Sequence, residues 1–275
     1  MEKIYEITAT GNNLPKDMKN YLYSLGLSVT LVKKAKYGGI FLNGNNVTVR
    51  ATVNAGDKIE LFLPKEKSEG IEPMDIPLNI IYEDDYLIAV DKPTNMPTHP
   101  SKGNNLPTLA NAVMGYYGSD FVFRAVNRLD RDTSGIVIIA KNKISASALS
   151  STMKSGAWKK RYHAIVDGCP FPEDAIIDAP IEREAEGNIK RCVRANGKRA
   201  VTKYKVIEKY ENSSLCEIEL FTGRTHQIRV HMAHIGHPLR SDFLYGIKGE
   251  NDYFLRCVEI SFPHPKTNEL LIIRA

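Results

Sequence analysis

The sequence has few cysteines and no long apolar run. No apolar stretch approaches the ~18 residues of a membrane-spanning helix, and the N-terminus, Met1-Glu2-Lys3-Ile4, lacks the basic and apolar regions of a secretory signal. The four cysteines lie far apart without a C-x-x-C pair, so we expect reduced thiols: Cys169, Cys192, Cys216 and Cys257. These absences predict a cytoplasmic protein without membrane contact.

The excess of positive charge is small. Lysine and arginine number 37 against 32 acidic residues, a net charge of +5, which suits a polyanionic partner but is also common in proteins that have none. The 275 residues, 43% of them apolar, are enough for one large domain and a small one. The chain contains no internal repeat and no low-complexity tract.

A charged segment rich in glycine and proline, "KEKSEGIEPMDIP", marks a domain boundary. We predict a small module at 1–64, a linker at 65–77 and a large domain at 78–275. Residues 1–64 hold eight basic and five acidic residues, which is +3 of the total of +5. In that module Lys33, Lys34 and Lys36 lie beside Tyr37, and these lysines either follow a phosphate backbone or form a solvated helix face.

The large domain alternates strand patterns with few helices. Strands are predicted in "LNIIYEDDYLIAVDKP", "GIVIIAKN", "KRYHAIVDG" and "LCEIELFTG", and a helix in "ISASALSSTMKSGAW". Because these elements follow no regular βαβ rhythm, we expect an α+β fold with a mostly antiparallel sheet.

Two aspartates stand close together in "VNRLDRDTSG", residues 126–135. The end of this stretch suggests an aspartic protease, but such an enzyme needs a second carboxylate, from a second motif copy or a dimer, and the motif occurs once. Arg128 and Arg131 flank Asp130 and favour its ionised form, which suits a nucleophile or an electrostatic stabiliser. Asp132 fits a turn in which aspartate accepts hydrogen bonds from backbone amides.

A second stretch, "GRTHQIRVHMAHIGH", is rich in histidine: His226, His231, His234 and His237. It could hold a metal, but it contains no acidic residue or cysteine and no H-E-x-x-H pattern. It could also be a helix whose histidines bond locally. With Arg224 and Arg229 interleaved, we favour a donor-rich surface for phosphate and carboxylate oxygens.

These motifs, in this order, resemble those of the RluA/RluD-type pseudouridine synthases. The family signature H-R-L-D-x-x-T-S-G matches N-R-L-D-R-D-T-S-G at 127–135, and "IIYEDDYLIAVDKP", "KRYHAIVDG", "GRTHQIRVHMAHIGHPLRSDFLYG" and "FPHP" also agree. The resemblance runs from about residue 78 to the C-terminus. The first 64 residues more loosely resemble an S-four-like RNA-binding module.

The resemblance implies an isomerase that converts uridine in ribosomal or transfer RNA to pseudouridine. Asp130 would detach uracil from its ribose as nucleophile or charge stabiliser. Tyr162 would pack on the base or remove its carbon-5 proton, and Arg224 would pair with the catalytic carboxylate. Arg128 would fill the space left by the flipped nucleotide. No metal or cofactor is expected.

We expect RNA contacts in both regions and a monomeric protein. The residues predicted to bind RNA are Arg128, Lys33, Lys34, Lys36, His226, Gln227 and Arg229. The alternative is a non-catalytic RNA-binding or ribosome-assembly protein. The sequence departs from the family pattern at three places. Asn127 replaces a histidine. A Gly-Asp pair of the family is replaced by Arg240-Ser241-Asp242, and the common Leu-His-Ala is replaced by Leu255-Arg256-Cys257.

Overall fold

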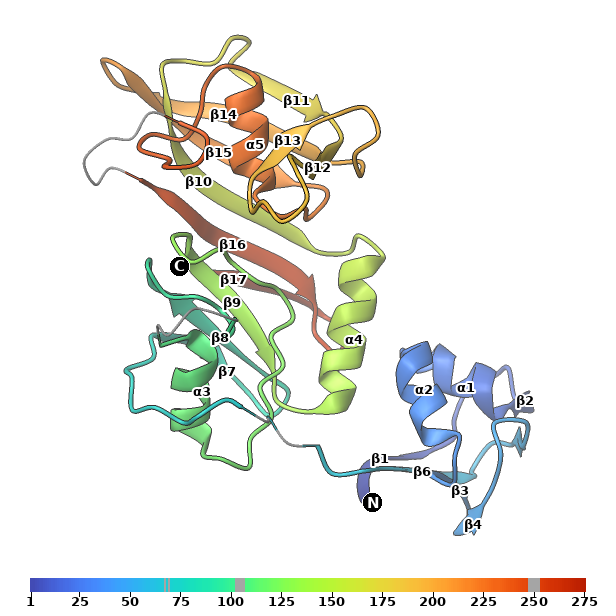
Figure 1. Cartoon of the computed structure of the whole chain (residues 1–275). Coiled ribbons are helices and arrows are strands. Elements are labelled where there is room, and N and C mark those ends of the chain that lie inside the picture. The colour runs from blue at the N-terminus through green and yellow to red at the C-terminus, as the bar shows by residue number, and fades with distance from the viewer. Residues whose placement is uncertain (67, 69, 102–106, 247–252) are drawn as a thin grey trace.

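The computed structural model of the chain describes residues 1–66, 68, 70–101, 107–246 and 253–275. Two large hydrophobic clusters are present. The buried residues of one run from Ala9 to Leu63, and those of the other from Leu87 to Ile273. Figure 1 shows the corresponding parts of the chain side by side, with α4 (Lys143–Lys154) between the small module and the large sheet.

The small module combines a four-stranded antiparallel sheet, in the order β1-β6-β3-β4, with two short helices and a β2–β5 pair. The Asp17 carboxylate caps the first helix by accepting from the Asn20 amide, and the Ser28 hydroxyl caps the second by accepting from the Leu31 amide. The elements are β1 (Glu2–Thr8), β2 (Lys16–Asp17), α1 (Met18–Ser24), α2 (Val29–Ala35), β3 (Ile40–Leu42), β4 (Asn45–Asn46), β5 (Thr52–Val53) and β6 (Lys58–Leu63).

The large domain is built on a nine-stranded sheet in the order β11-β14-β15-β10-β16-β9-β8-β7, with β17 also paired to β16. Every pairing in it is antiparallel except that of β9 with β16, which confirms the predicted α+β fold with a mixed, mostly antiparallel sheet. The strands are β7 (Ile80–Glu83), β8 (Leu87–Lys92), β9 (Ser134–Ala140), β10 (Lys159–Asp167), β11 (Asp174–Asp178), β14 (Val201–Lys209), β15 (Ser213–Leu220), β16 (Leu255–Pro263) and β17 (Leu270–Arg274).

The parallel pairing of β9 with β16 explains the glycine that ends the T-S-G triplet. Gly135 lies opposite Cys257 in this pairing. Its φ is 106°, and a Cβ there would stand 2.2 Å from the Cys257 carbonyl oxygen. A side chain at residue 135 would therefore separate the two strands beside the predicted catalytic loop.

Three helices and a small hairpin complete the large domain. Helix α3 (Leu109–Tyr117) begins with a capping box between Thr108 and Asn111. Helix α4 packs on β9 and β16, and α5 (Gln227–His234) packs on β14 and on the hairpin β12 (Ile181–Arg183) and β13 (Arg191–Val193).

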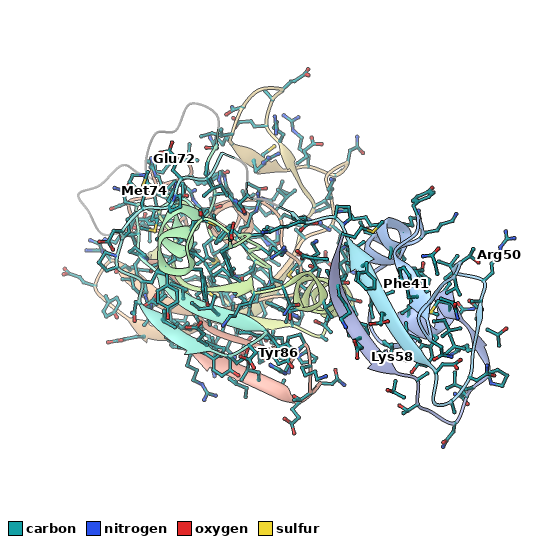
Figure 2. All side chains as sticks on the ribbon, turned by 90° about the horizontal axis from the view of Figure 1, so that it is seen from below. Phe41, Arg50, Lys58, Glu72, Met74 and Tyr86 are labelled. Carbon is teal, nitrogen blue, oxygen red and sulfur yellow. The ribbon has the colours of Figure 1, made fainter. Side chains whose placement is uncertain are left out.

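The segment predicted as a linker lies along the large domain. The Asn111 side chain donates to the Glu72 carbonyl at 2.8 Å, and the Met74 amide donates to the Asn111 carbonyl at 3.1 Å. Helix α3 has Gly115 at this contact, where a Cβ would lie 2.0 Å from the Met74 carbonyl oxygen. Figure 2 shows Glu72 and Met74 on the large domain, away from Phe41 on the small module.

Direct contacts join the small module to α4. The Ser28 amide, at the start of α2, donates to the Ser147 hydroxyl at 2.7 Å. The buried Lys143 ammonium donates to the Pro64 carbonyl at 2.7 Å, and Ile144 packs against the hydrophobic cluster of the small module. The module is therefore docked on a helix of the large domain as well as joined to it through the chain.

Candidate active site

A cleft of about 580 Å³ lies where β10, β15 and β16 meet the segments 97–101, 125–133 and 223–229. Asp130 is the one carboxylate among its described lining residues. Five lining residues are basic: Arg128, Arg131, Lys160, Arg224 and Arg229. The aspartic-protease hypothesis therefore finds no second carboxylate in this cleft, whereas the excess of cations suits a polyanionic ligand.

The loop that carries Asp130 is fixed on both sides of the aspartate. After it, the Thr133 amide donates to the Asp130 carbonyl at 3.2 Å and closes a turn. Before it, the side chain of Leu129 is buried, and the Thr98 hydroxyl donates to the Leu129 carbonyl at 2.9 Å. The Asp130 carboxylate itself stays partly exposed to the cleft, with 36% of its side chain accessible.

The buried ammonium of Lys92 holds this loop through hydrogen bonds. Lys92, which ends β8, has no accessible surface and donates to the carbonyls of Pro93, Met96 and Arg131 at 2.8, 2.7 and 3.1 Å. Burial lowers the pKa of Lys92 to about 8, against the opposing charge of nearby aspartates. Its three donors are all used, so Lys92 joins the end of β8 to the residue after Asp130.

Asn127, which stands where the family has histidine, is a structural residue. Its side-chain amide donates to the Ile136 carbonyl at 3.0 Å, and its side-chain oxygen accepts from the Ile138 amide at 2.8 Å. The side chain is buried and mimics one rung of a β-ladder beside β9. This substitution therefore anchors the start of the catalytic loop.

The arginine beside the Asp130 carboxylate is Arg229, not Arg224. One guanidinium nitrogen of Arg229 lies 4.0 Å from the Asp130 Oδ2. Two others donate to both oxygens of the fully buried Asp242, at 2.7 and 2.6 Å. Burial alone would lower the pKa of Arg229, but the Asp242 carboxylate raises it. Three aromatic rings surround its guanidinium carbon at 5.1 to 5.6 Å: Tyr245, Phe243 and Tyr253.

The loop that presents Asp242 contains the second departure from the family. Ser241 has a φ of 58°, in the left-handed region that favours glycine. The Asp242 carboxylate accepts from the amides of Leu244 and Tyr245 at 2.9 and 3.2 Å. Ser241 therefore adopts a backbone conformation that glycine takes readily.

His226 faces Asp130 from the other side, with its Nε2 3.9 Å from the Asp130 Oδ2. The Arg191 amide donates to the Tyr245 hydroxyl oxygen at 2.9 Å, and that hydroxyl lies 2.7 Å from the His226 Nδ1. Where the hydroxyl donates to Nδ1, the ring proton of neutral His226 lies on Nε2, toward the carboxylate.

His226 is also held in an unusual backbone conformation. Its φ is 57°, and it stands at the N-terminal end of α5 without forming a side-chain cap. Burial lowers the pKa of His226, although the Asp130 charge opposes this shift, so the imidazole is neutral near pH 7. Strained residues of this kind gather at functional sites.

Tyr162 forms part of the cleft floor. The side chain is buried, and its hydroxyl contacts the Cys257 thiol. Burial raises the pKa of Tyr162 well above its usual value, so the hydroxyl stays protonated at neutral pH. Beside the ring the cleft is apolar, which suits a flat base: Met153, Leu220, Ile228 and Leu255.

Two residues predicted for the site have other roles in the structure. The Arg224 side chain is exposed and its Nε donates to the Arg199 carbonyl at 2.9 Å, so the expected pairing of Arg224 with Asp130 is replaced by that of Arg229. The Gln227 side chain is buried and donates to the Val201 carbonyl and the Thr202 hydroxyl. Gln227 therefore fixes α5 to β14 in place of the expected RNA contact.

The remaining histidines of the stretch separate in space. His231 is fully buried and both ring nitrogens are bonded, to the Thr202 hydroxyl and the Ala179 carbonyl. His237 bonds the Asp167 carbonyl through Nδ1. Within the described ranges, no three histidine, cysteine or acidic side chains are grouped as metal ligands.

Arg128 is exposed and lines the cleft, where a side chain could enter a nucleic acid. Asp132 points to its neighbour: both of its oxygens accept from the Arg131 guanidinium, at 2.9 and 3.1 Å. The turn expected to depend on Asp132 is instead closed by the Thr133 amide on the Asp130 carbonyl.

The three lysines of the small module that were predicted to bind RNA lie around the end of α2. Lys33 is exposed, Lys34 forms an ion pair with Glu66 at 3.4 Å, and the Lys36 ammonium lies 5.8 Å from the centre of the Tyr37 ring. Tyr37 is 80% exposed. An exposed ring beside a lysine offers both stacking and charge to a single-stranded nucleic acid.

Reasoning from the sequence missed three residues that hold the site: Lys92, Asp242 and Tyr245. Lys92 and Asp242 stand in stretches that the resemblance includes, "VDKP" and "LRSDFLYG". A lysine at the end of an apolar strand was a usable sign of a buried ammonium. Nothing local links Tyr245 to His226, because their contact depends on how two loops fold together.

Comparisons with known proteins show the family of the chain. A model described as RNA pseudouridylate synthase matches residues 86–234. The chain is 37% identical over 260 residues to the uncharacterized RNA pseudouridine synthase YjbO of Bacillus subtilis, covering 92% of each chain. It is 38% identical over 228 residues to the ribosomal large subunit pseudouridine synthase D of Haemophilus ducreyi, covering 80% of this chain and 69% of that protein.

The fold is also similar to that of a solved structure, human RNA pseudouridylate synthase domain containing 1. The TM-score is 0.63 at 25% identity, over 72% of this chain and 83% of that one. Separately, no helix in the part of the chain that the structure describes has the length and apolar character to cross a membrane.

Proposed function

The chain belongs to the RNA pseudouridylate synthase family and is an isomerase that acts on RNA, and from this premise we propose that it isomerises uridine in ribosomal RNA with Asp130 as the reacting carboxylate. The observation that carries the proposal is the position of Asp130: a lone carboxylate, partly exposed, in a cleft lined by cations. The relative named for the ribosomal large subunit supports ribosomal over transfer RNA. We propose that the enzyme acts as a monomer, since one chain supplies the whole cleft.

The reaction rearranges bonds within one nucleotide. The uridine leaves the RNA stack to enter the cleft, and Arg128 fills the space that it vacates. The Asp130 carboxylate attacks or stabilises ribose carbon 1′ while the glycosidic bond between carbon 1′ and ring nitrogen 1 breaks. The base turns, carbon 5 bonds carbon 1′, carbon 5 loses a proton and nitrogen 1 gains one. The product has the composition of the substrate.

The residues around Asp130 support separate steps. One Arg229 guanidinium nitrogen and the His226 Nε2 lie about 4 Å from the carboxylate and orient it toward the ribose. Tyr162 and the apolar floor hold the detached base. Because burial keeps the Tyr162 hydroxyl protonated, Asp130 is the better acceptor for the carbon-5 proton once it has left carbon 1′.

The decisive experiment replaces Asp130 with asparagine. Purified wild-type and Asp130→Asn proteins are incubated with unmodified transcripts of ribosomal and transfer RNA, and pseudouridine is mapped in each. We expect the wild type to modify a ribosomal transcript and the variant to make no product while still binding it. Product formation by Asp130→Asn at the wild-type rate would refute the role of Asp130, and conversion of transfer RNA alone would refute the choice of RNA.

We propose that the small module, 1–64, adds RNA affinity through Lys33 and Lys36. Lys34 contributes less, because Glu66 already pairs with it. Lys33→Gln/Lys36→Gln should lower RNA affinity and reduce its salt dependence, while removal of the exposed Lys154 on α4 serves as the control. Unchanged affinity at every salt concentration would instead indicate a solvated helix face.

A further inference from the structure

A second groove, of about 540 Å³, adjoins the active-site cleft. Its walls come from the β12–β13 hairpin, the turn 196–198 and the segment 223–225. The last segment also lines the cleft that holds Asp130. The two hollows therefore share one wall, and Arg224 stands in it.

The side chains of this groove are strongly basic. Four cations line it: Arg183, Arg191, Lys198 and Arg224. Its one lining carboxylate, Glu182, lies 3.3 Å from the Arg194 guanidinium. Within the described residues, neither Arg183 nor Lys198 forms an ion pair. The groove thus presents positive charge that no carboxylate of its own neutralises.

Two arginines of the groove have donors without acceptors. The Arg191 Nε is buried and has no hydrogen-bond partner among the described residues, although buried donors are normally satisfied. The Arg224 Nε bonds the Arg199 carbonyl, and the Arg224 amide bonds the Gln227 side-chain oxygen. These contacts fix the arginine and leave its terminal nitrogens for an anion.

We propose that this groove binds the phosphodiester backbone of the RNA strand adjoining the flipped uridine. The inference rests on the proposed function, because a uridine held in the cleft stays covalently joined to its neighbours. The nucleotides on either side of this uridine must therefore run along the surface next to the cleft. This groove is such a surface, because it shares a wall with the cleft. Arg224 is then a backbone-binding residue, which explains why its side chain bonds the Arg199 carbonyl and not the Asp130 carboxylate.

The lining favours a phosphodiester chain over a free nucleotide. Among the described residues that line the groove, Ile181 is the one large apolar side chain and none is aromatic, so these residues offer a base no stacking surface. Charged arginines in an open groove instead suit phosphate oxygens that continue in both directions.

The test uses the full-length enzyme and the RNA transcript that the wild type modifies. In Arg183→Gln/Lys198→Gln both changed residues are exposed and neither contacts the Asp130 site. Lys205→Gln/Lys209→Gln removes equal charge from exposed positions of β14 outside both hollows. RNA affinity is measured at several salt concentrations together with kcat and KM. Arg183→Lys/Lys198→Arg keeps the charge.

We expect the groove variant to bind RNA on the order of tenfold more weakly. The slope of its log affinity against log salt concentration should be smaller by ~0.7 for each phosphate that the variant no longer neutralises. Its KM should rise while kcat stays near the wild-type value, and the charge-retaining variant should bind as the wild type does. An equal loss of affinity in the β14 variant, or no loss in the groove variant, would overturn the proposal. So would weaker binding of uridine monophosphate with unchanged RNA binding, which would indicate a small-anion site.

Failure of the proposed function gives a different result. In that case Asp130→Asn makes product at the wild-type rate, or the wild type modifies transfer RNA alone. Failure of the groove proposal leaves those results unchanged and makes the groove variant indistinguishable from the β14 variant.

Discussion

His226 and Asp130 face each other with 3.9 Å between Nε2 and Oδ2, and the Tyr245 hydroxyl lies 2.7 Å from the Nδ1 of the same ring. Tyr245→Phe removes the hydroxyl that bonds Nδ1, so the imidazole loses the contact that can hold its proton on Nε2. We expect a lower kcat with little change in KM. The loss should be smaller than the about hundredfold cost of a directly bonded donor, because 3.9 Å is long for a hydrogen bond.

The control is Tyr116→Phe, which changes an exposed tyrosine on α3. A lower kcat in both variants, or an unchanged kcat in Tyr245→Phe, would show that the ring proton of His226 does not matter to the reaction.

The two arginines of the histidine-rich stretch should differ in what they change. Arg229→Lys removes the bidentate hydrogen bonding to Asp242 and should lower kcat, because its charge near Asp130 is no longer fixed. Arg224→Gln should raise KM and leave kcat nearly unchanged. Steady-state kinetics on one RNA transcript separate these effects, and the reverse pattern would restore Arg224 as the partner of Asp130.

Arg229 also contributes to stability. Arg229→Met leaves the buried Asp242 carboxylate without its partner, and we expect a loss of about 3–5 kcal/mol in the free energy of unfolding. Chemical denaturation measures this. The double variant Arg229→Met/Asp242→Asn should recover part of the loss, and a single variant as stable as the wild type would contradict the buried ion pair.

Tyr162 should matter more as a ring than as an acid or base. Since burial raises its pKa, little phenolate exists near pH 7, and Tyr162→Phe should retain far more activity than Tyr162→Ala. Product formation is compared for both variants between pH 6 and 9. If Tyr162→Phe is as inactive as Tyr162→Ala, the hydroxyl takes a direct part in proton transfer.

Because Lys92 is buried, we expect the free energy of unfolding to rise at alkaline pH. Its pKa is about 8 in the folded protein and about 10.4 in an unfolded chain. Between these values the unfolded state binds one more proton, so the free energy of unfolding increases with pH, by about 3 kcal/mol in total. The difference in unfolding free energy between wild type and Lys92→Met should grow by this amount from pH 8 to 10.5. A constant difference would mean that Lys92 titrates normally.

Ser241 offers a stabilising substitution. Its left-handed backbone costs a serine roughly 1 kcal/mol or more relative to glycine, and part of that gain is lost through the greater freedom of glycine in the unfolded chain. Ser241→Gly should therefore raise the free energy of unfolding by up to about 1 kcal/mol with unchanged kcat. A destabilised variant would show that the serine side chain has a role of its own.

Local patterns were enough to predict the strands around Asp130, whereas its proposed role came from the resemblance of the motif to a family. The turn after "NRLD" and the apolar run of β9 are readable from neighbouring residues. The parallel pairing of Gly135 with Cys257 is not, because it joins residues far apart in sequence.

The choice between Arg224 and Arg229 also depended on tertiary structure. Both arginines stand in one short stretch, and α5 begins between them at Gln227. His226, whose φ is left-handed, also lies between them. Arg229 lies beside the Asp130 carboxylate, whereas the Arg224 side chain at the edge of the cleft bonds the Arg199 carbonyl. No spacing rule gives the direction of a side chain next to a strained residue.

Glu72 and Met74 are hydrogen-bonded to Asn111 of α3, which attaches this part of the segment between the two domains to the large domain. The Ser28 amide is also bonded to Ser147 on α4, so the small module contacts the large domain at a second place besides the connecting segment. In this docked arrangement, an RNA that contacts both the small module and the Asp130 cleft must span the distance between them. The docking would then select uridines by their spacing from a second structural feature of the RNA.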